Sequence, residues 1–181
     1  MKNNQTKVII PCRFSYLHCW EPVAINNSEP KYSVSAVIPK SDTKTVEAIK
    51  AAVEQAKKEG VAKWGGKIPP NLKLPLRDGD IDRPDDPNYA DAYFVNANSN
   101  ERPGVVDRRR VPITDPLEVY SGCYVRASLT FYPFNTNGNR GVACGLQNIQ
   151  KWCDGEPLNG RVRAEDEFDA LDDVDDEDFL D

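Results

Sequence analysis

Residues 124–134 (YVRASLTFYPF) carry the residue types in this chain that could do chemistry. Side chains point alternately to the two faces of an extended strand. One face would carry the apolar residues Val125, Ala127, Leu129 and Phe131. The other would carry Tyr124, Arg126, Ser128, Thr130, Tyr132 and Phe134. Aromatic rings stack on unpaired bases of any sequence, and a guanidinium between them can meet a phosphate or another base. The second face therefore predicts a groove for single-stranded nucleic acid, unless its rings cover a second small core.

Three consecutive arginines, Arg108, Arg109 and Arg110, stand in a predicted loop. Side chains on a loop can fan out toward a phosphate backbone, although a run of three arginines is equally compatible with solvated surface. Further basic residues lie in or beside predicted strands: Arg13, Lys31, Arg126, Arg140 and Lys151. We therefore expect the arginine triplet to hold phosphates beside the aromatic face. The expected neighbours of that face are Arg13, Lys151 and Trp152.

The charge of the chain is divided between a basic body and an acidic end. The formal net charge is -6, but residues 164–181 hold 11 of the 29 acidic residues and no basic ones. Residues 1–163 therefore carry 23 basic and 18 acidic residues, a net charge of +5. Such a division is typical of a nucleic-acid-binding domain with an interaction tail. We expect a folded domain over residues 1–163 and a disordered acidic tail over residues 164–181.

The acidic tail ends with an aromatic residue among carboxylates: Asp176, Glu177, Asp178 and Phe179. A partner with a basic rim and a small apolar pocket could hold this tip through one aromatic anchor. A flexible chain of the tail's length reaches about 25 Å, so the tail could also fold back over the groove. We therefore hypothesise that the tail binds a partner and competes with nucleic acid. The alternative is an appendage that only solubilises the chain.

Enzymatic and metal sites find little support in the sequence. The one histidine, His18, has no pattern of a nucleophile or metal site around it. The acidic stretch 78–91 begins with the spacing of a calcium loop, but Arg83 occupies the required glycine position and Tyr89 the final glutamate position. No P-loop or dinucleotide-binding glycine motif is present. We predict a protein without catalytic activity, cofactor or metal, and keep a metal-dependent nuclease as the least favoured alternative.

The cysteines and the hydropathy of the chain indicate a reducing compartment. The five cysteines form no CxxC pair, and an odd number fits free, mostly buried thiols better than a disulfide framework. The N-terminal residues MKNNQTK precede no apolar stretch of signal-peptide length. No apolar run reaches the roughly 18 residues that a membrane span requires. We expect a cytoplasmic protein with no membrane partner.

The elements that must position these side chains are mostly strands. Residues 7–17 and 31–38 are rich in β-branched and aromatic residues, and residues 92–97 predict a further strand. Residues 122–152 contain two β-rich runs joined by NTNGN at 135–139. Asparagine and glycine tolerate the positive φ angles of a tight turn. The sequence therefore predicts a long hairpin that includes the aromatic face.

One helix interrupts this pattern. Ser41 or Asp42 can cap a helix that runs to about Glu59 and stops at Gly60. Its core-facing positions follow helical spacing: Val46, Ile49, Val53 and Ala56. Residues 61–121 hold 8 of the 14 prolines, which predicts long loop insertions.

The order of the predicted elements favours a single, mainly β domain. A mostly antiparallel sheet with one helix removes its exposed edges by closing into a barrel. The five-stranded OB-fold is the commonest barrel with so few strands. We therefore predict a five-stranded OB-fold barrel with one α-helix, long loop insertions and a disordered acidic C-terminal tail.

Three segments resemble a family of bacteriophage single-stranded-DNA-binding proteins. They are IPKSDTKTVEAIKAAVEQA (residues 38–56), SGCYVRASLTFYPFNTNGNRGVACGLQNIQK (residues 121–151) and the acidic tail ending in DDEDFLD. The family is similar in plan to the OB-fold replication and recombination protein of T7-like phages, whose acidic tail ends in an aromatic residue. In this chain Leu180 and Asp181 follow Phe179, so the aromatic residue is not terminal.

The resemblance implies binding and protection of single-stranded DNA during phage replication and recombination, in the cytoplasm of the infected bacterial host. It also implies that the tail contacts phage or host replication proteins. We expect base sequence to matter little and leave open whether the chain forms a homodimer. The competing class is a protein-interaction adaptor that uses the same aromatic face.

Overall fold

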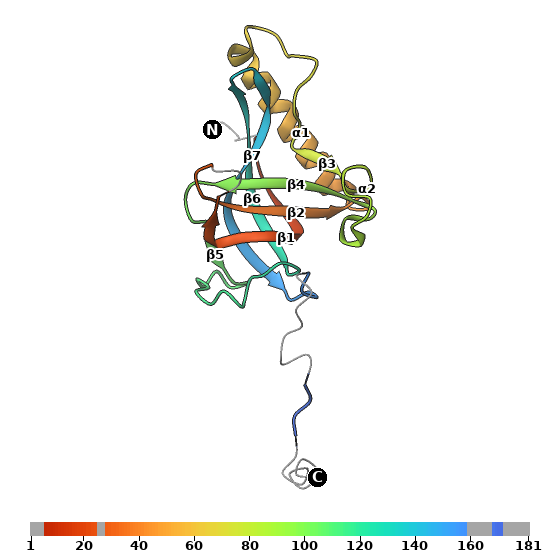
Figure 1. Ribbon diagram of the computed structural model, residues 1–181, viewed down its shortest axis with the longest axis vertical. Helices are drawn as coiled ribbons and strands as arrows, with labels where there is room; N and C mark the ends of the chain where they lie inside the picture. Colours follow the sequence, from red (N-terminus) through yellow and green to blue (C-terminus); the bar gives the residue numbers. More distant parts are fainter. Residues whose placement is uncertain (1–5, 25–27, 159–167, 172–181) are drawn as a thin grey trace.

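Five long strands form the body of the protein. The structure, a computed structural model, describes residues 6–24, 28–158 and 168–171 (Figure 1). The long strands are β1 (Lys7–Val23), β2 (Lys31–Pro39), β4 (Ala92–Ser99), β6 (Tyr124–Thr136) and β7 (Asn139–Cys153). Each of the strands expected from the sequence is present, and the first is longer than expected because β1 continues to Val23 through two register shifts against β2.

Pairing between β4 and β7 closes these strands into a barrel. The strands lie in the order β4-β2-β1-β6-β7, and each neighbouring pair is antiparallel. A parallel pairing of Asn98 with Gly145 then joins β4 to β7. Closure leaves none of the five strands as an open edge, which confirms the predicted five-stranded OB-fold barrel. Two short strands extend the sheet: β3 (Leu76–Asp78) beside β4 and β5 (Gly104–Val106) beside β7.

The main helix, α1 (Thr43–Gly60), forms where the sequence predicts it. The Asp42 carboxylate accepts a hydrogen bond from the Thr45 N–H and caps its first turn. Its predicted core positions are buried: Val46, Ile49, Val53 and Ala56. Figure 1 shows α1 running beside the far part of the β6–β7 hairpin. The helix thus covers one end of the barrel core.

The hairpin turn uses the expected residues. Asn137 and Gly138 have φ angles of 51° and 86°, the left-handed conformations that a two-residue hairpin turn requires. Below the turn, the short helix η1 (Val61–Trp64) holds the hairpin, because the Trp64 indole N–H donates to the Phe134 carbonyl at 3.0 Å. The far part of the hairpin is therefore fixed against the end of α1.

Residues 61–121 contain more structure than the predicted loops. Besides η1, β3 and β5, they form α2 (Gly79–Asp82) and η2 (Pro87–Tyr89). Asp78 caps α2 and Asp86 caps η2 through hydrogen bonds to backbone N–H groups two residues on. Each of these elements is four residues or shorter, so none has the periodicity that identifies a longer element in a sequence.

Most of the predicted acidic tail lies outside the residues that the structure describes. The predicted tail, 164–181, and its tip at 176–179 lie outside the described residues except for 168–171. In that short stretch Phe168 and Leu171 are exposed.

Among the described helices, none has the length and apolar character needed to cross a membrane.

Candidate nucleic-acid interface

The two faces of β6 separate as the alternating pattern predicts. The apolar set is buried in the barrel core: Val125, Ala127, Leu129 and Phe131. On the outer face, Tyr124 and Tyr132 are 41% and 42% exposed, and Arg126 is also exposed. These rings therefore do not fill a sealed second core.

Ser128 is the one buried polar residue on the outer face of β6. Its hydroxyl accepts the Asn148 N–H at 3.0 Å, beside a register shift between β6 and β7. The extra residue in β7 displaces the usual ladder, and the serine hydroxyl satisfies the backbone group that the displacement leaves without a partner. Ser128 thus supports the local shape of the sheet.

Arg13 and Tyr124 form one unit across β1 and β6. The two residues are cross-strand partners, and the guanidinium carbon lies 5.5 Å from the ring centroid, within the range of a cation–π contact. Nε donates to the Gly122 carbonyl at 3.0 Å and Nη2 to the Glu156 carbonyl at 2.7 Å. Arg13 therefore fixes the ring of Tyr124 and ties β1 to the segment that follows β7.

Trp152 stands next to this unit because β7 has a second register shift. Tyr124 pairs with Cys153 while Val125 pairs with Lys151, so Trp152 occupies the extra position between them. Its side chain is 48% exposed. A bulge re-aims the side chain that it carries, and here it places an indole on the outer surface beside Tyr124.

Three adjoining hollows run across the outer surface around these residues. The first, about 410 Å³, has Arg13, Tyr124 and Trp152 in its wall. The second, about 190 Å³, shares Trp152 with the first and adds Arg108 and Arg126. The third, about 320 Å³, shares Arg126 and Gln150 with the second and adds Lys7, Ile9 and Arg110. Together they follow the sheet from β2 to β5, four strand spacings or about 19 Å.

Gln150 connects Arg126 to the arginine triplet. The Arg126 guanidinium donates from Nη1 to the Gln150 side-chain oxygen at 3.1 Å. The amide nitrogen of Gln150 donates to the backbone carbonyls of Asp107 and Arg108, both at 3.3 Å. This chain of hydrogen bonds sets the triplet beside the β6–β7 surface. The Arg126 guanidinium has further N–H donors, with which it can bind a phosphate or a base edge.

The triplet itself sits on a turn built by Asp107. The Asp107 carboxylate accepts the N–H groups of Arg109 at 2.8 Å and Val111 at 2.9 Å. Arg110 adopts a left-handed φ of 68°. All three arginine side chains are exposed, and none forms an ion pair within residues 6–24, 28–158 and 168–171. The loop therefore displays three unpaired positive charges at one end of the groove.

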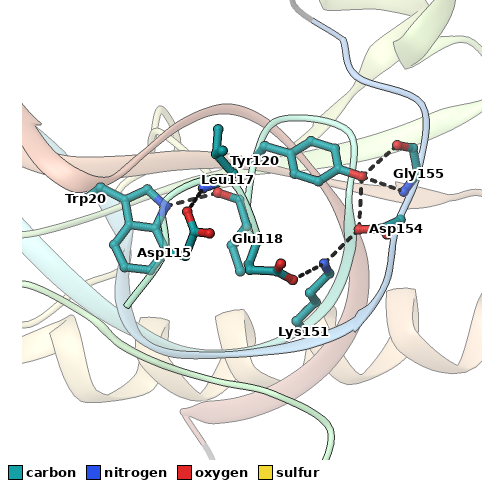
Figure 2. A network of polar contacts seen from close by, with 9 residues as sticks. Trp20, Asp115, Leu117, Glu118, Tyr120, Lys151, Asp154 and Gly155 are labelled. Atoms are coloured by element: carbon teal, nitrogen blue, oxygen red, sulfur yellow. Dashed lines mark hydrogen bonds and ion pairs between the residues drawn. The ribbon is translucent and has the colours of Figure 1, made fainter. Parts of the chain in front are cut away.

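Unlike the arginines of the triplet, Lys151 is paired with two carboxylates, which Figure 2 shows. Its ammonium lies 3.2 Å from a Glu118 carboxylate oxygen and 2.7 Å from one of Asp154, and its side chain is only 13% exposed. Burial lowers the pKa of Lys151, but hydrogen bonds to Asp154 and Glu118 outweigh it and raise the pKa above its ordinary value. Two carboxylates thus neutralise this lysine, which lies directly before Trp152.

Tyr120 completes the same network. Its hydroxyl donates to the Gly155 carbonyl at 2.8 Å and accepts the Gly155 N–H at 3.1 Å. The network joins the segment before β6 to the residues after β7 (Figure 2). It thereby fixes the backbone on both sides of Trp152.

Tyr132 and Phe134 lie at the other end of the β6–β7 hairpin. Tyr132 is eight residues from Tyr124 along β6, a distance of about 26 Å in an extended strand. Burial, with a smaller contribution from Cys144, raises the pKa of Tyr132. Its ring lies close to Gly145, because a Cβ added at that glycine would be 3.7 Å from the ring. Phe134 is half-buried. The predicted aromatic face is therefore divided into two separate areas.

Sequence reasoning missed several residues of the groove. Gln150, Ile9 and Pro11 line it, but none belongs to a residue type that attracts attention alone. The signal that could have found them is strand register, since Pro11 and Gln150 are the cross-strand neighbours of Arg126. That register depends on bulges that the sequence does not reveal.

The acidic stretch 78–91 is tied to the fold by ion pairs and caps. Lys40 lies 2.9 Å from Asp78 and 2.7 Å from Asp80, and Arg77 lies 3.0 Å from Asp82. Among the described residues, no group of three or more histidine, cysteine, aspartate or glutamate side chains could hold a metal ion. These carboxylates shape the loop that borders the first hollow.

Sequence comparison matches residues 6–180 to the family described as the Enterobacter phage Enc34 single-stranded-DNA-binding protein. A relative from Acyrthosiphon pisum secondary endosymbiont phage 1, "Putative protein p50", is 34% identical over 180 residues. That match covers 93% of this chain and 95% of the relative.

Solved structures give a consistent result. The single-stranded DNA-binding protein of bacteriophage Enc34 in complex with single-stranded DNA superposes with a TM-score of 0.73 and 29% identity. The match covers 84% of this chain and 88% of that one. The single-stranded DNA-binding protein gp2.5 of bacteriophage T7 gives a TM-score of 0.59 at 16% identity, covering 88% and 98% of the two chains, which supports the fold alone.

Proposed function

Because the chain belongs to the family of the Enterobacter phage Enc34 single-stranded-DNA-binding protein, we propose that it binds single-stranded DNA on the outer surface of its barrel. The observation that carries the proposal is the grouping of Tyr124, Trp152 and Arg126 along neighbouring hollows that share lining residues. The family is one of binding proteins, which agrees with the prediction that the chain is not an enzyme.

In the proposed complex, unpaired bases stack on Tyr124 and Trp152, the two exposed rings that flank the first hollow. Base stacking contributes about 1–3 kcal/mol per base. The sugar-phosphate chain runs toward Arg126 and the triplet Arg108, Arg109 and Arg110, whose unpaired charges replace counterions. Stacking and phosphate contacts accept every base, so the bulk of the affinity is independent of sequence.

Tyr132 provides a second stacking position for longer strands. It lies about 26 Å from Tyr124 along β6, beyond the three connected hollows. Phe134 supports that position from the hairpin, because its backbone is fixed to η1. Arg13 and Lys151 act from beneath the site by holding Tyr124 and the backbone around Trp152.

We assign two roles to the acidic tail, 164–181. Its 11 negative charges compete with DNA for the arginine end of the groove, because both ligands are polyanions there. Its tip, Asp176, Glu177, Asp178 and Phe179, recruits phage or host replication proteins. The protein then protects single strands during replication and recombination in the cytoplasm of the infected bacterium.

The test is binding to fluorescent oligo-dT in EDTA at two salt concentrations, with the full chain and with a variant that ends at Arg163. We expect metal-independent binding that weakens with salt, and tighter binding by the shortened chain at low salt only. Absence of binding to any oligonucleotide would refute the proposed function. Equal affinities of the two chains at low salt would refute only the competition by the tail.

A further inference from the structure

The first hollow differs in polarity from the rest of the groove. Tyr124 and Trp152 form one side, and Pro11, Val37 and Pro39 add apolar contacts. The opposite rim carries two carboxylates and an amide: Asp42, Asp91 and Asn88. Its volume of about 410 Å³ is within the range of small-ligand pockets, which combine apolar walls with a few placed polar groups.

The backbone of Asp91 is held in an uncommon conformation at this rim. Its φ is 54°, a left-handed value that aspartate tolerates better than most residues. The Asp91 N–H donates to the Asp80 carboxylate at 3.0 Å, and the Asp91 carbonyl accepts the Lys40 N–H at 3.0 Å. Lys40 also holds the Asp80 carboxylate at 2.7 Å. Both backbone groups of Asp91 are therefore fixed.

The carboxylate of Asp91 is the group left for a ligand. It forms no ion pair or hydrogen bond with any side chain in the described part of the protein, and Asp91 is one of the residues that line the hollow. Asp42 is fixed as well, because its two oxygens accept the Thr45 N–H at 3.3 Å and the Thr45 hydroxyl at 2.6 Å. Each of these oxygens retains a second lone pair. The rim thus presents the Asp42 oxygens in a fixed position and the Asp91 carboxylate on a fixed backbone.

Charge decides which ligand fits this rim. Of the described residues that form the wall, one is a cation, Arg13, whose guanidinium already donates to the Gly122 and Glu156 carbonyls. The two carboxylates outnumber it and repel a phosphate or the acidic tail of the chain, so neither is a suitable occupant. An unpaired base offers a flat face to Tyr124 and Trp152, and cytosine, adenine and guanine also carry an exocyclic amino donor. Thymine and uracil carry a carbonyl oxygen in place of this amino group, which a carboxylate disfavours, and their one donor on this edge, the ring N3–H, is flanked by two carbonyl oxygens.

We propose that this hollow receives one unpaired base with an exocyclic amino group, and that the Asp91 carboxylate accepts a hydrogen bond from that group. This inference rests on the proposed function. It adds a base preference at a single position to binding that is otherwise independent of sequence.

Oligo-dC and oligo-dU of equal length provide the test, because their bases differ only in the exocyclic group at C4, amino in cytosine and carbonyl in uracil, and in the proton that uracil carries on N3. Affinities are measured with the full chain at slightly alkaline pH, where cytosine is neutral. We expect about fivefold tighter binding of oligo-dC, the effect of one hydrogen bond to a charged acceptor at a partly exposed site.

Two variants and a control assign the preference to Asp91. Asp91→Gly keeps the left-handed backbone accessible and removes the acceptor, so the ratio of the two affinities should fall to about one. Asp91→Asn keeps a neutral acceptor and should give an intermediate ratio. Asp85→Asn removes an exposed charge from the same loop, outside the hollow, and should leave the ratio unchanged.

The outcomes separate the inference from the proposed function. Equal binding of oligo-dC and oligo-dU by the unaltered chain would overturn the inference and leave single-strand binding intact. An unchanged ratio in Asp91→Gly would also overturn it. Failure to bind either oligonucleotide would instead contradict the proposed function itself.

Discussion

Two exposed groups of the groove, Tyr124 and Arg126, are supported by neighbours that are themselves partly buried. Arg13 lies against Tyr124, and Gln150 links Arg126 to the arginine loop. The outward alternation of Tyr124 and Arg126 could be predicted from sequence because it depends only on strand parity. The role of Lys151 could not, because its partner Glu118 lies 33 positions away and only the fold brings the two together.

The arginine triplet should control the salt dependence of binding. Replacing Arg108, Arg109 and Arg110 with alanine removes three unpaired charges from one loop. We expect the log–log slope of affinity against salt to decrease by about 0.7 for each phosphate that the variant no longer binds. Titrations at several salt concentrations measure this slope, with Lys44→Ala on the exposed face of α1 as the control. An unchanged slope in the triple variant would contradict the assigned role.

Lys151 should behave in the opposite way. Lys151→Met removes a charge that Glu118 and Asp154 already neutralise, so DNA binding should weaken severalfold while the salt slope stays the same. The free energy of unfolding should fall by about 1 kcal/mol or less, because the Glu118 and Asp154 side chains are 55% and 62% exposed and water screens the lost ion pairs. Salt titrations and urea unfolding test both effects. A slope reduced as in an arginine variant would show that Lys151 contacts phosphate directly.

At the scale of elements, the β6–β7 hairpin determines how much DNA the protein contacts. Its existence and turn could be predicted, since Asn137 and Gly138 suit the required conformations. So could α1, which has a capping aspartate and a regular apolar stripe. The two bulges that expose Trp152 and bury Ser128 could not, because they reflect the matching of two strands and not a property of either alone.

The length of this hairpin predicts different effects for its two tyrosines. Tyr124→Ala should weaken binding of all oligonucleotides by about 5- to 100-fold, the equivalent of one base that no longer stacks. Tyr132→Ala should weaken only strands long enough to cover the distance of about 26 Å between them. The measurement compares the affinity of each variant with that of the unaltered protein for oligo-dT of about four and about sixteen nucleotides. These lengths span the range of OB-fold site sizes. Equal losses of affinity at both lengths in Tyr132→Ala would place the two rings in one compact site.

At the scale of the whole molecule, barrel closure protects most of the thiols. Cys12, Cys19, Cys123 and Cys144 are buried, and Cys153 is exposed. Burial, with a smaller contribution from Cys123, raises the pKa of Cys19 from 9.0 to about 12. Burial also raises the pKa of Cys12, Cys123 and Cys144. The folded barrel therefore retains these thiol protons under conditions in which the unfolded chain releases them.

The burial of the four thiols predicts how the cysteines react with thiol reagents and how the stability of the protein depends on pH. A thiol reagent at neutral pH should modify Cys153 quickly and the other four cysteines only after denaturation. Because the folded pKa values are raised, their stabilising effect is complete below about pH 9, the ordinary pKa of the thiol in the unfolded chain. The effect is lost progressively as pH rises toward the folded pKa, about 12 for Cys19. Urea unfolding at increasing pH measures the loss; stability that rises over this range would contradict the buried, neutral thiols.

The three tryptophans allow a direct test of where DNA lies on the barrel. Trp64 is buried at 5% exposure and Trp152 is 48% exposed, while the indole N–H of Trp20 donates to the Val119 carbonyl at 3.0 Å. Oligo-dT that stacks on the outer surface beside Tyr124 should therefore quench mainly Trp152. The decisive measurement is fluorescence quenching by oligo-dT in the unaltered protein and in Trp152→Phe. We predict strong quenching that the substitution removes, while binding followed by anisotropy of a labelled oligonucleotide persists. Full quenching in Trp152→Phe would place the bound strand on another part of the protein and contradict the proposed groove.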